Sequence, residues 1–337
     1  MTAEPRGGAA ERGRRHGGVG SASEQPPAER KGIGPEGGAA ERGRRHGDLL
    51  VLAAALCFGS TFPVTKEALD DVGPYALVAL RFLAGGLLLL PWALRRPPGE
   101  REGRAVAWCS VALLAGYLLL TVGLQRTTST AAAFICYLLV VIVPVLSAVL
   151  LRRPPSAPVV AGVVLATAGL FLLAGDGVGR LGPGEALVLG CAVAFAVHIL
   201  LLDHFGATLD PVRFTAFQLL AVGVVALVPA AVRGELGGLR PAGLAATAFL
   251  GAAGLGGLLL QIRGQRTVGP SRTSLLLMLE PVLAAVGGYA IGERIAPWGF
   301  VGAALILLGI LVSEAMPVGP KWDRRELPLD PRVRLPG

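Results

Sequence analysis

Polar and ionisable side chains are scarce within the long apolar stretches of this 337-residue chain. Glu280 is the only carboxylate well inside such a stretch, Arg81 lies inside a second one, and His198 lies inside a third. A charge near the centre of a lipid bilayer costs on the order of 3 kcal/mol, so these groups should face the interior of a helix bundle or a water-filled cavity. The candidates for contact with a small molecule there are Glu280, Arg81, His198, Gln218, Thr61 and Tyr137.

The Glu280 carboxylate has two interpretations. It could carry a proton or another cation, or it could bind a cationic substrate. Alternatively, Pro281 frees a backbone carbonyl one turn earlier and kinks its helix, and Glu280 then fixes the kink. A buried ion pair with Arg81 would also account for it without any function.

Each of the other candidates also has a structural and a functional interpretation. Arg81 and Gln218 lie 137 residues apart, the offset of an internal repeat, and they either bond neighbouring helices or contact a substrate. His198 is equivalent to Thr61 at the same offset. It is either a hydrogen-bonded packing residue or a proton relay, because imidazole titrates near neutral pH. Weaker candidates for lining a cavity are Ser60, Tyr117 and Gln261.

The elements that hold these residues are predicted to be membrane-spanning helices. Apolar residues make up 53% of the chain and charged residues 16%, against about 25% charged in a soluble domain. The mean hydropathy is +0.62. Backbone groups in lipid need partners within their own segment, so spans of about 20 apolar residues must be helical. Ten such segments are predicted: Leu49–Thr65, Pro74–Leu94, Ala105–Leu124, Ala131–Leu151, Ala157–Gly175, Ala186–Leu202, Phe214–Val232, Pro241–Ile262, Thr273–Gly292 and Ile295–Ser313.

These segments form two copies of one unit. At an offset of 137, six residues of Gly47–Phe58 return in Gly184–Phe195, among them Gly47 as Gly184 and Phe58 as Phe195. At an offset of 140, Gln125-Arg126-Thr127 returns as Gln265-Arg266-Thr267, and Gly162 returns as Gly302. The repeats are predicted over residues 48–175 and 183–314. Because each holds five spans, an odd number, the second must cross the membrane in the opposite sense, as in transporters built from inverted repeats.

The charges cluster outside the spans. Residues 1–47 are predicted to be a disordered basic tail, in which G-G-A-A-E-R-G-R-R-H-G occurs twice, and residues 315–337 to be a second tail. Ten arginines fall in the gaps on the side of the N-terminus, against six Lys or Arg residues in the opposite gaps. This bias predicts that both termini are cytoplasmic. The net charge of +8 is therefore attributed to membrane topology and not to nucleic-acid binding.

No cofactor or metal is predicted. The G-x-G-x-x-G pattern at Gly177–Gly182 joins two spans, whereas a dinucleotide site needs a strand before it. There is no Walker loop and no H-E-x-x-H. The four cysteines, Cys57, Cys109, Cys136 and Cys191, lie in apolar runs without C-x-x-C spacing and are expected to be packing residues. Any driving force must then come from an ion gradient, from exchange, or from the substrate's own gradient.

Four stretches resemble the drug/metabolite transporter superfamily, EamA type. They are G-D-L-L-V-L-A-A-A-L-C-F-G-S-T-F at Gly47–Phe62, L-R-F at Leu80–Phe82, T-A-A-A-F-I with V-V-I-V-P-V-L at Thr130–Leu146, and S-L-L-L-M-L-E-P through G-E-R at Ser274–Arg294. The resemblance covers residues 47–314. It implies ten helices and the export or exchange of small metabolites, amino acids or drugs.

The predicted protein is therefore an all-α integral membrane protein of the cytoplasmic membrane, with ten transmembrane helices in two inverted repeats. We expect a secondary transporter, not an enzyme, that exports a small metabolite such as an amino acid by alternating access. Its partners would be the small-molecule substrate, membrane lipid and protons, and it would be a monomer or homodimer. The alternatives are a multidrug or nucleobase exporter, although an aromatic content of 6% disfavours an aromatic drug cage. A membrane-embedded enzyme acting on lipid is the alternative of another class.

Overall fold

The computed structural model describes residues 35–95, 99–127, 129–150, 152, 154–174, 182–206, 209–237, 239–290 and 297–314. The chain divides into a unit of Met1–Ala39, of which residues 35–39 are described, and a unit of Ala40–Gly337. Every regular element within the described ranges is an α-helix, as predicted.

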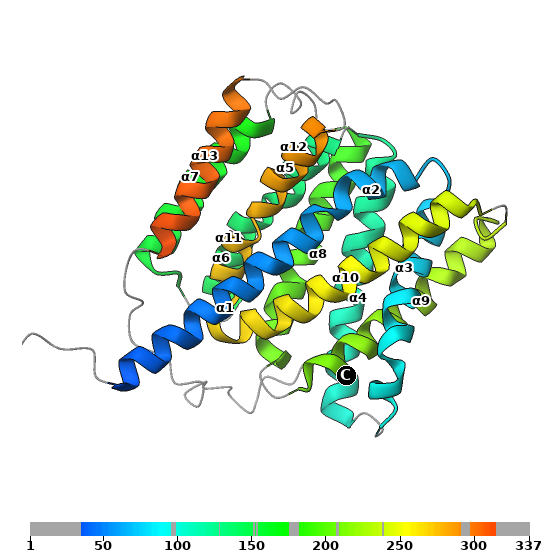
Figure 1. Ribbon diagram of the computed structural model, residues 1–337, viewed down its shortest axis with the longest axis horizontal. Coiled ribbons are helices and arrows are strands. Elements are labelled where there is room, and N and C mark those ends of the chain that lie inside the picture. Colours follow the sequence, from blue (N-terminus) through cyan, green and yellow to red (C-terminus); the bar gives the residue numbers. More distant parts are fainter. Residues whose placement is uncertain are drawn as a thin grey trace, which may run out of the picture. The chain divides into compact units, whose positions relative to one another are not determined.

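The helices of the second unit are numbered along the chain, and α1 begins just before it (Figure 1). They are α1 (Pro35–Gly59), α2 (Thr61–Ala68), α3 (Pro74–Ala93), α4 (Glu100–Leu124), α5 (Ser129–Tyr137), α6 (Leu139–Leu150), α7 (Ala157–Ala174), α8 (Pro183–Gly206), α9 (Pro211–Val232), α10 (Pro241–Val268), α11 (Pro270–Leu276), α12 (Leu279–Ala290) and α13 (Pro297–Glu314).

Seven stretches of the described chain are long and apolar enough to cross a membrane. They are Glu41–Ala68, Pro74–Ala93, Glu100–Leu124, Ala132–Leu150, Pro183–Phe205, Pro211–Val232 and Pro241–Val268. Two shorter apolar helices, Ala157–Leu172 and Pro297–Ser313, match the fifth and tenth predicted segments. The ninth is divided between α11 and α12. A multi-span membrane protein is therefore confirmed, whereas the count of ten spans stays a prediction.

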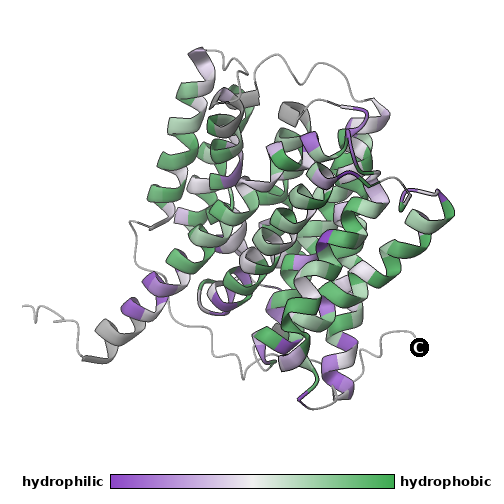
Figure 2. Ribbon diagram, turned by 45° about the vertical axis from the view of Figure 1, so that its right-hand side comes forward, coloured by the Kyte–Doolittle hydropathy of each residue, from purple (hydrophilic) through white to green (hydrophobic). Residues whose placement is uncertain are grey.

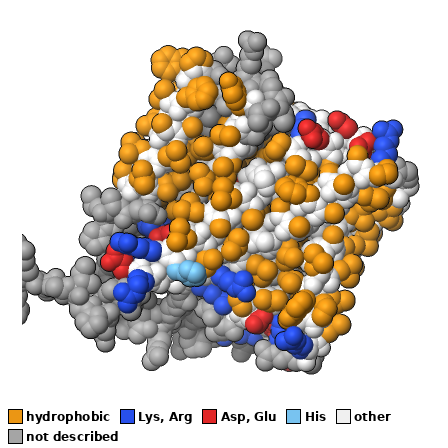
Figure 3. All heavy atoms as spheres, in the orientation of Figure 1, with side chains coloured by type: hydrophobic (Ala, Val, Ile, Leu, Met, Phe, Trp, Pro, Cys, Tyr) orange, Lys and Arg blue, Asp and Glu red, His pale blue; other side chains and the backbone are white. Residues whose placement is uncertain are grey.

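The outer surface suits a lipid environment. Large apolar side chains such as Leu88, Val232, Phe300 and Leu311 are exposed. Hydrophobic side chains cover the middle of the face seen in Figure 3, and charged side chains gather toward its ends. The hydropathy colouring in Figure 2 likewise shows long hydrophobic stretches on the helices. Such a large apolar surface would be costly in water.

The first helix begins earlier than predicted. Helix α1 starts at Pro35, so residues 35–47 are helical where the sequence predicted disorder. This part of the chain holds the second copy of the duplicated motif, whose Ala, Glu and Arg residues favour helices. Arg45 also pairs with Glu41 one turn earlier, at 2.7 Å. Residues 1–34 and 315–337, which hold the rest of the predicted tails, lie outside the described residues, as does most of the Gly177–Gly182 pattern.

Several helix starts are encoded by proline and an acidic cap. Pro211 opens α9, and the Asp210 carboxylate accepts a hydrogen bond from the Arg213 backbone N–H at 2.9 Å. Pro74 opens α3, whose N–H groups at Tyr75 and Ala76 donate to Glu235 of the α9–α10 connection at 2.8 and 2.9 Å. These carboxylates satisfy backbone donors that have no partner within the helix.

Three predicted spans are broken in the middle. Pro281 cannot donate to the Leu277 carbonyl, which instead accepts from the Glu280 N–H at 2.9 Å, and α11 ends there. The first copy breaks at Leu138, between α5 and α6. The first span breaks at Ser60, between α1 and α2. Pro63 accounts for this break, because in a continuous helix its ring would clash with the carbonyl of Gly59, four residues earlier.

Equivalent helices of the two repeats pack against each other in opposite directions. Helix α3 packs along α9, with Gly86 against Leu220 and Gly223 against Leu83. Helix α7 packs along α13 in the same way, with Gly162 against Gly309 and Gly169 against Gly302, and Figure 1 shows this pair side by side. A Cβ at Gly162 would lie 2.6 Å from the Gly309 carbonyl oxygen, so only glycine permits this approach.

The contact between α4 and α8 is repeated by the contact between α10 and α1, but the offset between α4 and α10 differs from the predicted one. Gly123 of α4 packs on Val188 of α8, and Gly264 of α10 packs on Val51 of α1. Val51 and Val188 are 137 residues apart, as predicted, but Gly123 and Gly264 are 141 apart and not 140. The match of the two Gln-Arg-Thr sequences is therefore out of register by one residue, because packing follows the helix face that carries the glycines.

Candidate functional site

A cavity lies among α1, α2, α3, α4, α5, α6, α8, α10 and α12. The space between its atoms is about 740 Å³, and part of this is open solvent. Five of the six predicted site residues line it: Glu280, Arg81, His198, Thr61 and Tyr137. The sixth, Gln218, lies behind His198 and contacts it. The structure thus brings together residues from both repeats, while their roles stay predictions.

The Glu280 carboxylate is bonded to the first repeat. Tyr137 ends α5, Glu280 lies in the first turn of α12, and the Tyr137 hydroxyl donates to Glu280 Oε2. Both side chains are buried, and each lies next to a helix break, which turns it toward the other. The start of a helix also favours a carboxylate, since the helix dipole is positive there. The buried ion pair between Glu280 and Arg81, one of the structural interpretations, is not formed.

The Arg81 guanidinium instead contacts aromatic rings. Its Cζ lies 4.8 Å from the ring centroid of Tyr117 and 5.5 Å from that of Phe82. Tyr117 packs edge-on against Phe82 on one side and Phe195 on the other. Cation–π contacts of a desolvated arginine are worth about 2 kcal/mol, so these rings offset part of the cost of burying the charge.

His198 and Gln218 form a buried pair between α8 and α9. The Gln218 amide nitrogen lies 2.7 Å from His198 Nε2, so the amide donates and the imidazole accepts. In the equivalent place of the first repeat, the Thr61 hydroxyl donates to the Phe58 carbonyl at 2.7 Å. The Ser60 hydroxyl is similarly bonded to the Cys57 carbonyl and is exposed, whereas Tyr117 and Gln261 do line the cavity.

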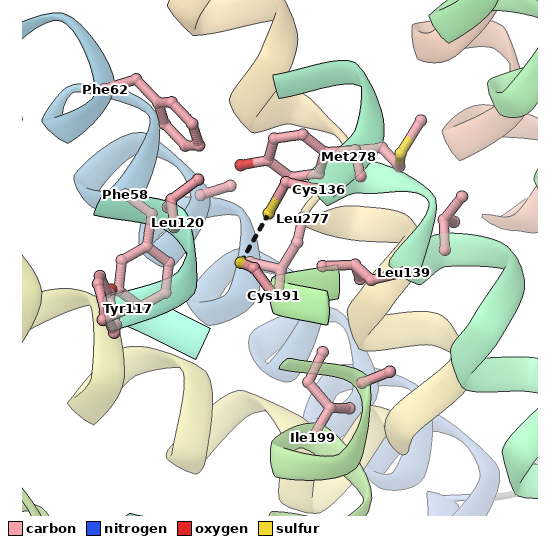
Figure 4. Close-up of a cluster of buried hydrophobic side chains, with 14 of the residues drawn as sticks. Phe58, Phe62, Tyr117, Leu120, Cys136, Leu139, Cys191, Ile199, Leu277 and Met278 are labelled. Carbon is pink, nitrogen blue, oxygen red and sulfur yellow. Dashed lines mark hydrogen bonds between the residues drawn. The ribbon is translucent and has the colours of Figure 1, made fainter. Parts of the chain in front are cut away.

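The sequence analysis missed the aromatic lining. Phe58, Phe62 and Phe195 join the two tyrosines in the wall, so five aromatic side chains line this cavity. Figure 4 shows Phe58, Phe62 and Tyr117 among the buried apolar side chains. One signal could have found them: Phe58 and Phe195 are equivalent at the 137-residue offset. The expectation that a low aromatic content disfavours an aromatic site is thereby weakened.

Two cysteines of the wall region lie close together. Cys136 Sγ of α5 is 3.7 Å from Cys191 Sγ of α8, and both thiols are buried and not bonded by a disulfide (Figure 4). Their packing role matches the sequence prediction. Within the described residues there is no cluster of three or more His, Cys, Asp or Glu side chains that could hold a metal ion.

Buried ion pairs join the two repeats at one end of the helix bundle. Arg272 of α11 binds Asp48 of α1 through two hydrogen bonds, Nε to Oδ1 at 2.6 Å and Nη2 to Oδ2 at 2.9 Å. Arg213 of α9 lies 3.3 Å from Glu102 of α4. Glu102 lies in the first turn of α4, whereas Leu124, at its other end, lines the cavity. The cavity thus reaches the end of α4 that lies far from these pairs.

A helical membrane protein with a central cavity lined by a few polar groups has the architecture of a transporter. Residues 45–175 and 182–314 match the EamA-like transporter family, one match for each repeat, and the chain belongs to this family.

Named relatives agree with this assignment. An uncharacterized transporter of Archaeoglobus fulgidus is 32% identical over 270 residues, which cover 79% of this chain and 84% of the relative. The uncharacterized transporter YwfM of Bacillus subtilis is 29% identical over 294 residues, covering 80% of this chain and 94% of the relative. A protein of known crystal structure superposes with a TM-score of 0.67 at 20% identity, over 79% of this chain and 96% of its own, and shares the fold.

Proposed function

We propose that this membrane transporter is a secondary transporter that exports a small metabolite, an amino acid or a similar compound, from the cytoplasm by alternating access. It would act in the cytoplasmic membrane with both termini in the cytoplasm. The observation that carries the proposal is a central cavity lined by residues of both repeats, with buried ion pairs joining the repeats at one end of the bundle.

The antiparallel packing of equivalent helices supports the inverted arrangement. Gly86 and Gly223 exchange contacts across α3 and α9, and Gly162 and Gly309 do so across α7 and α13. Two copies related in this way share a pseudo-two-fold axis in the membrane plane. Any conformation of one copy can then be adopted by the other, and an exchange of the two conformations moves the opening of the cavity from one side to the other.

The ion pairs supply a closing contact for such an exchange. Each pair joins one repeat to the other: Asp48 with Arg272, and Glu102 with Arg213. Opening the cavity at that end would separate these residues. If the N-terminus is in the cytoplasm, the end that carries the ion pairs also faces the cytoplasm. The structure would then correspond to a state that is closed on this side and opens outward.

The cavity wall limits the substrate. It is mostly apolar and aromatic, with Glu280, Arg81 and His198 as its ionisable groups apart from tyrosine and cysteine. A small compound with an apolar part and few polar groups fits such a wall. Glu280 would carry the coupling proton. The aromatic lining also favours a second candidate, the export of an aromatic drug or nucleobase, for which the same rings would stack on the substrate.

The proposal is tested by untargeted metabolite profiling of cells with and without the gene, followed by flux of the best compound in proteoliposomes of the purified chain. We expect at least one small metabolite to accumulate inside cells that lack the protein and to move across liposomes that contain it. If no compound of the panel differs between the cells and none moves in liposomes, the proposal is wrong.

A further inference from the structure

Arg81 is buried, and no described residue is a polar partner of its guanidinium. Only 3% of its surface is exposed, and its Nη2 is buried without a hydrogen bond. Its backbone is fixed by α10, since a Cβ on Gly251 would lie 2.7 Å from the Arg81 carbonyl oxygen. Beside the guanidinium, Gly254 of α10 presents no side chain. Within the part of the chain that the structure describes, the aromatic contacts of Arg81 are its only interactions, so it does not bond neighbouring helices through their carbonyls.

The second repeat holds a hydrogen-bonded pair of side chains at the equivalent positions. Gln218 is equivalent to Arg81, and His198 is equivalent to Thr61. In the second repeat these positions bond each other at 2.7 Å, while Gln218 Oε1 is buried without a hydrogen bond. In the first repeat the Thr61 hydroxyl is directed to its own backbone, and the position of the amide is taken by a cation. At this position an unpaired positive charge therefore occurs in the first repeat and not in the second, and it lines the cavity.

We propose that Arg81 is an anion-binding group and that the transported compound carries a carboxylate, which docks on this guanidinium while an apolar remainder lies against the aromatic wall. A guanidinium offers a planar pair of donors that match the two oxygens of a carboxylate. A bound carboxylate would neutralise a charge that is otherwise costly in a membrane interior.

Other charges fit less well. Among the described residues that line the cavity, Arg81 is the only Lys or Arg, while Glu280 adds a carboxylate. A phosphate dianion would bring two negative charges to one cation. A substrate with only a positive charge would meet the fixed guanidinium, and like charges at short range repel. A monocarboxylate with an apolar body therefore has the best charge balance.

This inference rests on the proposed function and chooses among its candidates. An amino acid has the required carboxylate, whereas neutral nucleobases and cationic drugs do not. A transporter of either of these would leave the Arg81 charge without a counter-ion in both the empty and the loaded state.

The test is ligand-induced thermal stabilisation of the purified full-length protein in detergent. The probes are two sets whose members share an apolar body and differ in the group attached to it, a carboxylate, an amine or a hydroxymethyl. The first set is 4-methylpentanoate, 3-methylbutylamine and 4-methylpentan-1-ol. The second is 3-phenylpropionate, 2-phenylethylamine and 3-phenylpropan-1-ol. A compound that binds the folded state raises the unfolding temperature. We expect at least one carboxylate to stabilise the wild-type protein and the amine and alcohol of its set to have no effect.

Variants then assign the effect to Arg81. Arg81→Gln should weaken carboxylate binding by about tenfold or more, since a charge-assisted contact is lost, and Arg81→Lys should weaken it less. Arg240→Gln, which removes an exposed arginine outside the cavity, is the matched control and should bind as the wild type does. If Arg81→Gln does not fold, the comparison of head groups on the wild-type protein still decides.

Two results would overturn the inference: an amine or alcohol that stabilises as well as its carboxylate, or no stabilisation by either carboxylate. Carboxylate binding that survives in Arg81→Gln would also contradict it. Flux in proteoliposomes is measured separately. Flux of amines or neutral compounds that does not depend on Arg81 would remove this inference and leave the proposed function standing, whereas Arg81-dependent binding without any flux would count against transport.

Discussion

The ion pair between Asp48 and Arg272 is predicted to hold the closed end of the cavity. The side chains are 8% and 7% exposed, and the pair is bidentate. A third bond runs from Arg272 Nη1 to the Ser313 carbonyl at 2.9 Å. Asp48→Asn removes the negative charge and leaves a buried guanidinium without its counter-charge, which costs about 3–5 kcal/mol.

That cost should appear as a change of conformation. If the pair exists only when this end is closed, losing about 3 kcal/mol of it shifts the equilibrium toward the state open at this end by about 100-fold. The assay is the rate at which a membrane-impermeant maleimide, applied from the side of the ion pairs, labels a cysteine placed at Ile199 in the cavity wall. The four native cysteines are replaced by alanine. We expect Asp48→Asn to raise the rate strongly.

A matched pair provides the control. Arg240 and Asp71 lie 3.1 Å apart, but the arginine side chain is 75% exposed. Exposed pairs contribute about 0–1 kcal/mol, so Asp71→Asn should leave labelling unchanged. The reasoning is refuted if Asp48→Asn lowers thermal stability without altering the labelling rate, because the pair would then stabilise the fold in every conformation equally.

Three further predictions concern other parts of the chain. Glu235→Ala removes the carboxylate that caps α3 and should lower the free energy of unfolding by about 1 kcal/mol, measured by chemical denaturation in detergent; no loss would mean that water replaces the cap. Gly169→Val places a Cβ 2.5 Å from the Gly302 carbonyl oxygen and should cost about 3 kcal/mol, measured by thermal unfolding against Ala168→Val as control. Glu280→Gln should abolish coupled transport in vesicles while the protein still reaches the membrane, and unchanged uptake across pH would contradict a proton-carrying role.

The sequence predicted the helical membrane fold because apolar runs leave few alternatives. The 137-residue offset was equally secure, since α3 and α9 meet at Gly86 and Gly223, which that offset relates. The offset of α4 and α10 was wrong by one residue. The alignment matched the identical residues Gln125 and Gln265, which are 140 apart. Close packing instead depends on the helix face that carries Gly123 and Gly264, which are 141 apart.

The cavity residues were predictable as a set but not as pairs. A polar side chain inside an apolar span has to turn inward, which placed Glu280 and Arg81 in one cavity. Which partner each meets depends on the helix breaks, and these bring Tyr137 to Glu280 and leave Arg81 on aromatic rings. Arg213 and Arg272 were counted as loop charges that orient the chain, whereas folding buries them against acidic partners. Their pairing needed the tertiary contact and could not be inferred from local sequence.

The central claim is that the two repeats cross the membrane in opposite senses. Arg95 follows the end of α3 and Arg233 follows the end of α9, and both are exposed. The most direct test places a single cysteine at one of these positions and applies an impermeant maleimide to sealed vesicles of known orientation. The account predicts labelling of Arg95→Cys from the cytoplasmic side only and of Arg233→Cys from the opposite side only. Labelling of both from one side would contradict it.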